Sequence, residues 1–154
     1  MKSSCLELKV INGPNLNLTG SRQNEIYGDF TLSQINANLT NLAINMQVEL
    51  SFYQSNIEGD LINEIQRCKT SNIDGLLVNL AAYTHTSIAL YDTLLACNIP
   101  FVEIHLSNIF SREKFRSHSY ISKIALGVIS GFGGNSYKYG LMALVDYLGQ
   151  KAQS

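Results

Sequence analysis

The feature that most constrains the fold of this chain is a regular alternation of short apolar runs with longer segments of helical periodicity. The apolar runs are rich in Val, Ile, Leu or Phe and have the length of strands: Leu6–Ile11, Val48–Tyr53, Gly75–Asn79, Phe101–His105 and Ile124–Ser130. Nearly continuous apolar runs are typical of parallel strands that are covered on both faces.

A helical segment follows each of these runs. In the first, Leu32–Met46, an apolar residue recurs at every third or fourth position, and Thr31 with Gln34 predicts a capping box at its start. The others are 61–68, Ser87–Ala96, the charged segment Ser111–Ser117 and 141–148. This order predicts one α/β domain over residues 1–154, built on a doubly wound, five-stranded parallel sheet.

Composition excludes several classes of partner. The formal net charge is −1 and only 15% of the residues are charged, which argues against a nucleic acid or another polyanion as partner. The longest apolar runs have strand length, so we expect no membrane span and no signal peptide. Cys5, Cys68 and Cys97 are odd in number and lack a CxxC pattern, which indicates reduced thiols and a cytoplasmic location.

In a doubly wound sheet, the loops that follow the strands converge on one edge, where ligands bind. The first strand leads into an amide-rich turn, Asn12–Asn17, and then into a glycine-flanked segment that carries Arg22 and Tyr27. A phenol is a strong base only when it is ionised, and a nearby guanidinium stabilises that form. We therefore expect Tyr27 and Arg22 to act together.

His105 ends the fourth strand, where a histidine is well placed to act as a general acid or base. Glu103 projects from the same face of the strand and can orient the imidazole. The alternative is a core histidine bonded to a buried glutamate. After the third strand, Asn79 and His85 are candidates for substrate binding, whereas Ser87 is a helix cap.

The charged segment after the fourth strand leaves two interpretations open. Arg112 and Arg116 lie four residues apart, on one face of the expected helix, and such pairs are usually solvated. Arg116 also follows closely on the His105 loop and can reach back to an anionic ligand. His118, at the end of the segment, is expected to lie on the surface.

Other kinds of site find little support. No HxxxH or HExxH pattern or thiol pair points to a metal, and no GxSxG elbow points to a serine nucleophile. The segment Gly131–Ser136 resembles a phosphate-binding turn but lacks the last glycine of GxGxxG, and we expect a tight strand-to-helix turn.

Taken together, these segments resemble the type II 3-dehydroquinate dehydratases. The matching motifs occur in that family's order: Ile11–Asn17, Arg22 with Tyr27–Gly28, Gln54–Asn56 with Glu58–Gly59, Asn79 with Thr84–Ser87, Val102–Asn108, Arg112–Glu113 with Phe115–Arg116, Ser119–Tyr120, and Gly127–Ile129 with Gly131–Gly133. They cover nearly the whole chain. The resemblance implies a flavodoxin-like fold with strand order 2-1-3-4-5.

The resemblance also implies a reaction: loss of water from 3-dehydroquinate by anti elimination through an enolate, without metal or organic cofactor. Tyr27 would remove the proton next to the ketone, and Arg22 would keep its phenol ionised. Asn15 would stabilise the enolate through a water. His105, oriented by Glu103, would protonate the departing hydroxyl.

By the same resemblance, the substrate contacts are Asn79, His85, Arg116 and the backbone of Leu106 and Ser107, which would anchor the carboxylate. Asp92 matches a residue that reaches the site of an adjacent subunit. The implied assembly is a homododecamer built from trimers. Glycines on either side of the segment with Arg22 and Tyr27 also predict a lid that closes over the substrate.

Two departures from the family pattern concern backbone conformation. The family usually has Asn-Pro-Gly after the third strand, whereas this chain has Asn79 followed by Leu80 and Ala81. The expected lid carries Gln23 and Asn24 where charged residues or proline are common. Neither departure removes a group that the chemistry needs.

Three other functions remain open from the residues: a flavin-binding module, a receiver-type signalling domain, and an inactive protein that retains only the fold. The turn after the first strand has no Ser or Thr before Thr19, which disfavours a flavin phosphate. Asn12 and Asn79 stand where a receiver domain needs acidic groups. The presence of Tyr27, Arg22 and His105 together favours an active enzyme.

Overall fold

The computed structural model describes residues 5–21, 23–27 and 29–152. The strands are β1 (Glu7–Asn12), β2 (Glu49–Gln54), β3 (Gly75–Asn79), β4 (Phe101–His105) and β5 (Gly127–Ser130). The α-helices are α1 (Asn24–Tyr27), α2 (Leu32–Asn45), α3 (Glu58–Thr70), α4 (Ile88–Cys97) and α5 (Asn135–Lys151).

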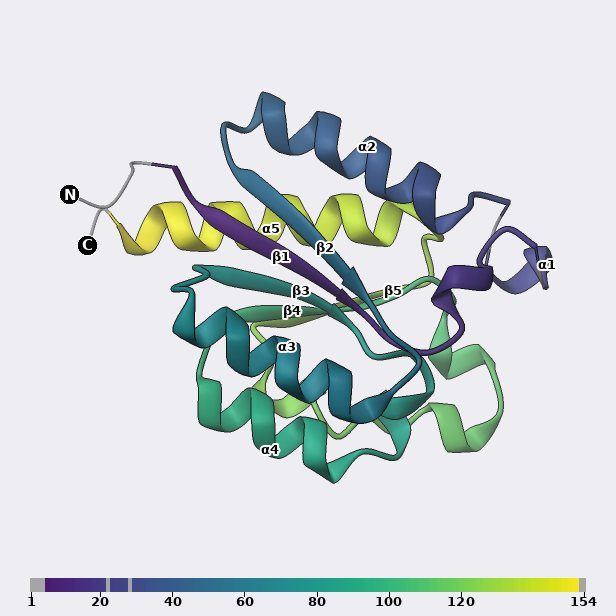
Figure 1. Cartoon of the computed structure of the whole chain (residues 1–154). Helices are drawn as coiled ribbons and strands as arrows, with labels where there is room; N and C mark the ends of the chain where they lie inside the picture. The colour runs from purple at the N-terminus through teal and green to yellow at the C-terminus, as the bar shows by residue number, and fades with distance from the viewer. Residues whose placement is uncertain (1–4, 22, 28, 153–154) are drawn as a thin grey trace.

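The strands form one sheet in the order β2-β1-β3-β4-β5, and every pair is parallel, as the sequence predicted. Helices α2 and α5 cover one face of this sheet, and α3 and α4 cover the other (Figure 1). The flavodoxin-like, doubly wound arrangement is therefore confirmed. Because all strands run the same way, their carboxyl ends meet at one edge.

The core has two halves because successive side chains of a strand point to opposite faces. The half under α2 and α5 includes Leu77 and Ile104, and the half under α3 and α4 includes Leu76 and Phe101. All residues of β3 and β4 are buried, whereas the edge strands β2 and β5 are partly exposed. Among the helices described, none has the length and apolar character to cross a membrane.

Two helices begin at the caps that the sequence predicted. The Thr31 hydroxyl accepts from the Gln34 amide at 3.2 Å, and the Gln34 side chain accepts from the Thr31 amide at 2.8 Å, which completes a capping box. At α4 the Ser87 hydroxyl accepts from the Leu90 amide at 2.9 Å. Both helices therefore start where local hydrogen bonding is strongest.

The prediction of a helix over Ser111–Ser117 is wrong. That segment forms two short 3-10 turns, Ile109–Ser111 and Lys114–Arg116. Phe110 and Phe115 are 69% and 65% exposed, so the segment buries no apolar stripe that would stabilise an α-helix. The fifth strand is also shorter than expected, because Ser122–Ile124 is a 3-10 turn and pairing starts at Gly127.

The remaining differences concern turns near the functional edge. Helix α1, a single turn, lies inside the segment that the sequence predicted as a lid. The turn between β5 and α5 has positive φ at Gly131 (100°) and Gly133 (58°), which confirms a tight strand-to-helix connection.

The turns after β1 and β3 pack against each other at the level of the backbone. The Gly13 amide donates to the Asn79 carbonyl at 2.7 Å, and a Cβ at Gly13 would lie 2.4 Å from the Leu80 carbonyl oxygen. Ala81 adopts a φ of +51°, a left-handed conformation that favours glycine. The departure from Asn-Pro-Gly noted above therefore places alanine where the backbone is strained.

Replacing Ala81 with glycine is expected to stabilise the protein. Relief of about 1–2 kcal/mol of left-handed strain exceeds the roughly 0.4–1 kcal/mol by which a glycine destabilises through greater freedom of the unfolded chain. The free energy of unfolding in urea should rise by about 0.5–1 kcal/mol. Ala82→Gly, at a neighbouring residue without positive φ, is the control and should lower that free energy. Equal losses in both variants would contradict strain at Ala81.

Candidate active site

A cavity opens at the carboxyl edge of the sheet, between the turns that follow β1, β3 and β4. Its lining combines the side chains that the sequence predicted for this edge with several neighbours: Pro14, Asn15, Leu16, Asn79, Ala81, Ala82, His85, His105, Leu106, Ser107, Ile109, Arg112 and Arg116. The parallel sheet brings these groups together from three separate stretches of sequence.

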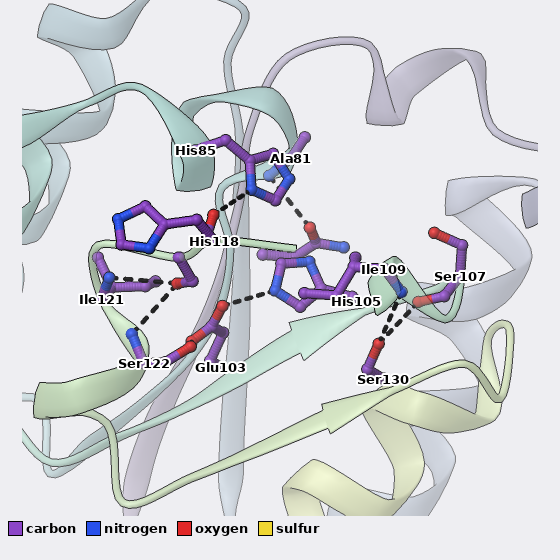
Figure 2. A network of polar contacts seen from close by, with 12 residues as sticks. Ala81, His85, Glu103, His105, Ser107, Ile109, His118, Ile121, Ser122 and Ser130 are labelled. Carbon is purple, nitrogen blue, oxygen red and sulfur yellow. Dashed lines mark hydrogen bonds and ion pairs between the residues drawn. The ribbon is translucent and has the colours of Figure 1, made fainter. Parts of the chain in front are cut away.

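His105 and Glu103 form a buried pair at the end of β4 (Figure 2). His105 Nε2 lies 2.6 Å from Glu103 Oε1, and the two residues are 5% and 0% exposed. The Ser122 hydroxyl donates to the other carboxylate oxygen, Oε2, at 2.5 Å. The pair was predicted from the sequence, but Ser122 was not, because it comes from a turn 19 residues further along the chain.

These hydrogen bonds determine the protonation of the pair. Burial alone raises the pKa of Glu103, but the hydrogen bonds from His105 and Ser122 outweigh burial and hold that pKa below its ordinary value of 4.5. A carboxylate only accepts hydrogen bonds, so Nε2 of His105 carries a proton. Nδ1 is then the ring nitrogen that is not committed to Glu103.

His85 lies above His105 in Figure 2, with the ring centroids 6.3 Å apart and the planes 17° from parallel. Its Nδ1 is 2.6 Å from the backbone carbonyl oxygen of His118. The residue His118 is exposed, as expected. A carbonyl only accepts, so Nδ1 carries the proton of neutral His85. Burial lowers the pKa of His85, and His105 and Arg116 lower it further against the opposing effect of His118. Neutral His85 therefore offers Nε2 as an acceptor.

Asn15 lines the cavity in a left-handed conformation, with φ 66° and ψ −1°. The backbone N–H of Asn15 donates to Asn56 Oδ1 at 2.9 Å, and the same oxygen accepts from Gln54 Nε2 at 3.1 Å. The Tyr83 hydroxyl donates to the Asn56 carbonyl at 2.8 Å. The loop after β2 thus holds the turn after β1, a role for Asn56 that the sequence analysis did not assign.

Leu106 and Ser107 follow β4 and are almost completely buried. The Ser130 hydroxyl, from β5, donates to the Ser107 carbonyl at 2.8 Å, and the Ile109 amide donates to Ser130 Oγ at 3.4 Å (Figure 2). The backbone expected to anchor a carboxylate is therefore held by the neighbouring strand.

Two guanidinium groups make this side of the cavity suitable for an anion. Arg112 is 12% exposed and its Nη1 lies 3.4 Å from Ser107 Oγ. Arg116 is 25% exposed and donates through Nε to Glu113 Oε2 at 2.9 Å. The prediction named Arg116 and treated Arg112 only as part of a charged pair. Both line the cavity: Arg112 directly follows the first 3-10 turn, Ile109–Ser111, and Arg116 ends the second, Lys114–Arg116.

Arg22 and the side chain of Tyr27 lie outside what the structure describes. The backbone of Tyr27 ends α1, and two other residues of that helix, Glu25 and Ile26, line a second cavity. Leu106, Ser107 and Arg112 line both cavities. Helix α1 therefore lies next to the turn that follows β4, on the same edge of the sheet.

Two residues of the predicted site whose side chains the structure describes do not line this cavity. Glu103 lies behind His105, to which it is bonded, whereas Asp92 has no such link to the cavity. It is exposed on α4 and is not among the residues that line the cavity.

Comparisons with known proteins identify relatives along nearly the full length of the chain. The family model described as "Dehydroquinase class II" matches residues 6–145. Proteins named 3-dehydroquinate dehydratase from Prochlorococcus marinus (strain NATL1A) and Bordetella avium (strain 197N) are 53% and 52% identical to this chain. The two alignments cover 93% and 90% of this chain and 98% and 96% of the relatives.

Solved structures agree with this result. The type II dehydroquinase from Butyrivibrio crossotus DSM 2876 superposes with a TM-score of 0.90 at 36% identity, over 92% of this chain and 99% of its own. The type II dehydroquinase from Propionibacterium acnes gives a TM-score of 0.87 at 32% identity, over 93% and 99% of the two chains.

The low pKa of Glu103 predicts how acid affects stability. A carboxyl group whose pKa is lower in the folded state contributes stability above about pH 4.5, and loses that contribution as the pH falls through the folded-state pKa. The difference in unfolding free energy between wild type and Glu103→Gln should therefore shrink between about pH 5 and 3.

Urea unfolding at half-unit intervals of pH measures this difference. Glu25→Gln, an exposed change in α1, serves as the control for general acid effects and should follow the wild type. If the unfolding free energies of wild type and Glu103→Gln change in parallel over the same pH range, the hydrogen bonds to Glu103 do not lower its pKa in the folded state.

Proposed function

This chain belongs to the class II dehydroquinase family, and we propose that it removes water from 3-dehydroquinate to give 3-dehydroshikimate. One observation of geometry carries the proposal: His105, held by buried Glu103, faces a cavity that two arginines also line. An acid placed beside an anion-binding surface suits elimination of water from a hydroxylated carboxylate. The family leaves the flavin-binding and receiver alternatives without support.

The first step is removal of a proton next to the ketone, which we assign to the ionised phenol of Tyr27. Arg22 stabilises the phenolate by its charge. The electron pair of the broken C–H bond moves into an enolate, and Asn15 supports the enolate oxygen through a water. The left-handed conformation of Asn15 and its bond to Asn56 support this role, because they hold the turn in one place before substrate binds.

The second step is departure of the hydroxyl, to which His105 supplies a proton. As the enolate collapses, the carbon–oxygen bond breaks, its electron pair leaves with the oxygen, and a proton from Nδ1 of His105 completes a water molecule. The bond from Nε2 to Glu103 supports this assignment, since it holds the ring in one orientation and leaves Nδ1 for the substrate. The tyrosine has then gained a proton and the histidine has lost one, so exchange with solvent resets both groups.

Binding of the substrate uses the rest of the cavity. The carboxylate of 3-dehydroquinate meets the backbone at Leu106 and Ser107, with the charge of Arg116 nearby. His85 accepts a hydrogen bond from a substrate hydroxyl through Nε2, and the amide of Asn79 binds another polar group. Closure of α1 over the cavity brings Tyr27 to the substrate and excludes water.

We also propose a domain organisation, a location and an assembly for this protein. Residues 1–154 form one catalytic domain that works without a metal or organic cofactor, in the cytoplasm. The assembly is a homododecamer built from trimers. Asp92 reaches the cavity of a neighbouring subunit, which is supported by its exposure on α4. Light scattering of the purified protein gives the mass that tests this assembly.

The direct test mixes chelator-treated protein with 3-dehydroquinate and follows the ultraviolet absorbance of the conjugated enone product. Rapid growth of the signal is expected. Prior incubation of the protein with substrate and borohydride together, followed by their removal, should not change it, because no imine forms between the protein and the ketone. A folded oligomer that gives no signal would refute the proposed activity. Loss of the signal after borohydride or chelator would instead refute the metal-free enolate mechanism.

Two variants separate base from acid. Tyr27→Phe should lower kcat by at least about a thousandfold, since it removes the base, while the dissociation constant for substrate changes little. His105→Ala should lower kcat by a similar factor with the fold intact. Tyr147→Phe, far along α5, is the matched control and should keep wild-type kcat. Turnover of either active-site variant within a few-fold of wild type would remove that residue from its role.

A further inference from the structure

We propose that Tyr137 is a positioning residue, which locks the amide of Asn79 so that it presents an N–H donor, not a carbonyl oxygen, to the substrate. This inference rests on the proposed function, because it concerns how the same cavity recognises 3-dehydroquinate. Tyr137 does not line the cavity. It acts from α5, on the other side of Asn79.

Three buried side chains form a chain of hydrogen bonds under the cavity. Asn79 Nδ2 lies 2.8 Å from the Tyr137 hydroxyl, and that hydroxyl lies 2.5 Å from Asn12 Oδ1. Asn12 and Asn79 are register partners at the carboxyl ends of β1 and β3. Their exposures are 1% and 2%, and Tyr137 is completely buried. One phenol from a helix therefore connects the last residues of two adjacent strands.

Which atoms donate and which accept in these hydrogen bonds follows from one group that can only donate. The backbone amide of Ala81 lies 3.2 Å from Asn79 Oδ1, and a backbone N–H only donates. Oδ1 of Asn79 must therefore be the atom that faces Ala81, and Nδ2 the atom that faces Tyr137. The phenol accepts from Nδ2, so its own proton goes to Asn12 Oδ1.

The opposite orientation of the Asn79 amide is unfavourable in this environment. It would place Nδ2 against the Ala81 amide, donor against donor, in a region that is almost completely buried. Tyr137 adds to this preference, because in the first orientation its hydroxyl accepts from Asn79 Nδ2 and donates to Asn12 Oδ1 at the same time. Burial raises the pKa of Tyr137, so the phenol stays protonated and is no rival to Tyr27 as the base.

An amide nitrogen carries two hydrogens, and Tyr137 uses only one of them. Asn79 lines the cavity, and its second N–H is then the side-chain group that it can offer to a ligand there. A donor at this point complements His85, whose Nε2 is an acceptor. Asn79 and His85 would thus distinguish an oxygen that accepts from a hydroxyl that donates, which orients the substrate ring.

The test uses Tyr137→Phe, which removes one oxygen and leaves the packing of the ring unchanged. Its kcat/KM for 3-dehydroquinate should fall by about tenfold or more, because the Asn79 amide loses a partner that selects its orientation. Leu144→Val, also buried on α5, is the control: it should lower the urea midpoint of unfolding but keep wild-type kcat/KM.

A double-mutant cycle with Asn79→Ala shows whether Tyr137 acts through Asn79. Once the amide is gone, Tyr137→Phe should cause no further loss of kcat/KM. The same fractional loss in both backgrounds would overturn the inference, as would a Tyr137→Phe enzyme that behaves like Leu144→Val. Wild-type turnover is measured in parallel. Its absence would refute the proposed function, whereas an additive cycle in an active enzyme refutes only the role of Tyr137.

Asn79→Asp gives a second test, which does not require Tyr137→Phe to fold. The carboxylate has the shape of the amide and keeps an acceptor for the Ala81 amide. It can also accept the phenol proton that Asn12 takes in the wild type, but it has no N–H for the substrate. Its kcat/KM should fall by at least about tenfold. Wild-type kcat/KM in this variant would show that Asn79 does not serve the substrate as a donor.

Discussion

The parallel register of β1, β3 and β4 is the constraint on which the rest of the molecule depends. It brings Asn12 opposite Asn79 and leaves His105 at the same edge, so three turns from distant parts of the chain share one cavity. The strands that bring these groups together are also the most buried ones, β3 and β4 in full. The candidate site is thus built on the most deeply buried part of the sheet, and α1, a single turn, lies beside it.

Burial at this edge has a chemical consequence. A buried polar group needs a hydrogen-bond partner. Glu103 is bonded by His105 and Ser122, and Asn79 by Ala81 and Tyr137. The bond to Glu103 places a proton on Nε2 of His105, and the bonds to Ala81 and Tyr137 orient the side-chain amide of Asn79. The hydrogen bonds of these buried groups therefore orient the proposed acid and a proposed binding group before any ligand arrives.

Much of this could be predicted from local sequence. The strand-helix alternation predicted the fold class, and the caps at Thr31 and Ser87 were confirmed. The pair Glu103 and His105 was predicted because alternate residues of a strand share a face. The helix expected over Ser111–Ser117 was wrong, because charge and spacing alone do not show whether a neighbouring surface exists to bury an apolar stripe. Tyr27 and Arg22 stay predictions.

The sequence by itself determined the order of the strands and of the long helices α2, α3, α4 and α5, the carboxyl ends of the strands to within one residue, and the residue types that gather there. These depend on periodicity and on short-range hydrogen bonding. Only the tertiary structure decided that Tyr137 supports Asn79, that Ser122 completes the pair at Glu103, and that Arg112 joins the cavity. These contacts join groups whose distance in space is set by packing across the sheet, and no local pattern of residues encodes that distance.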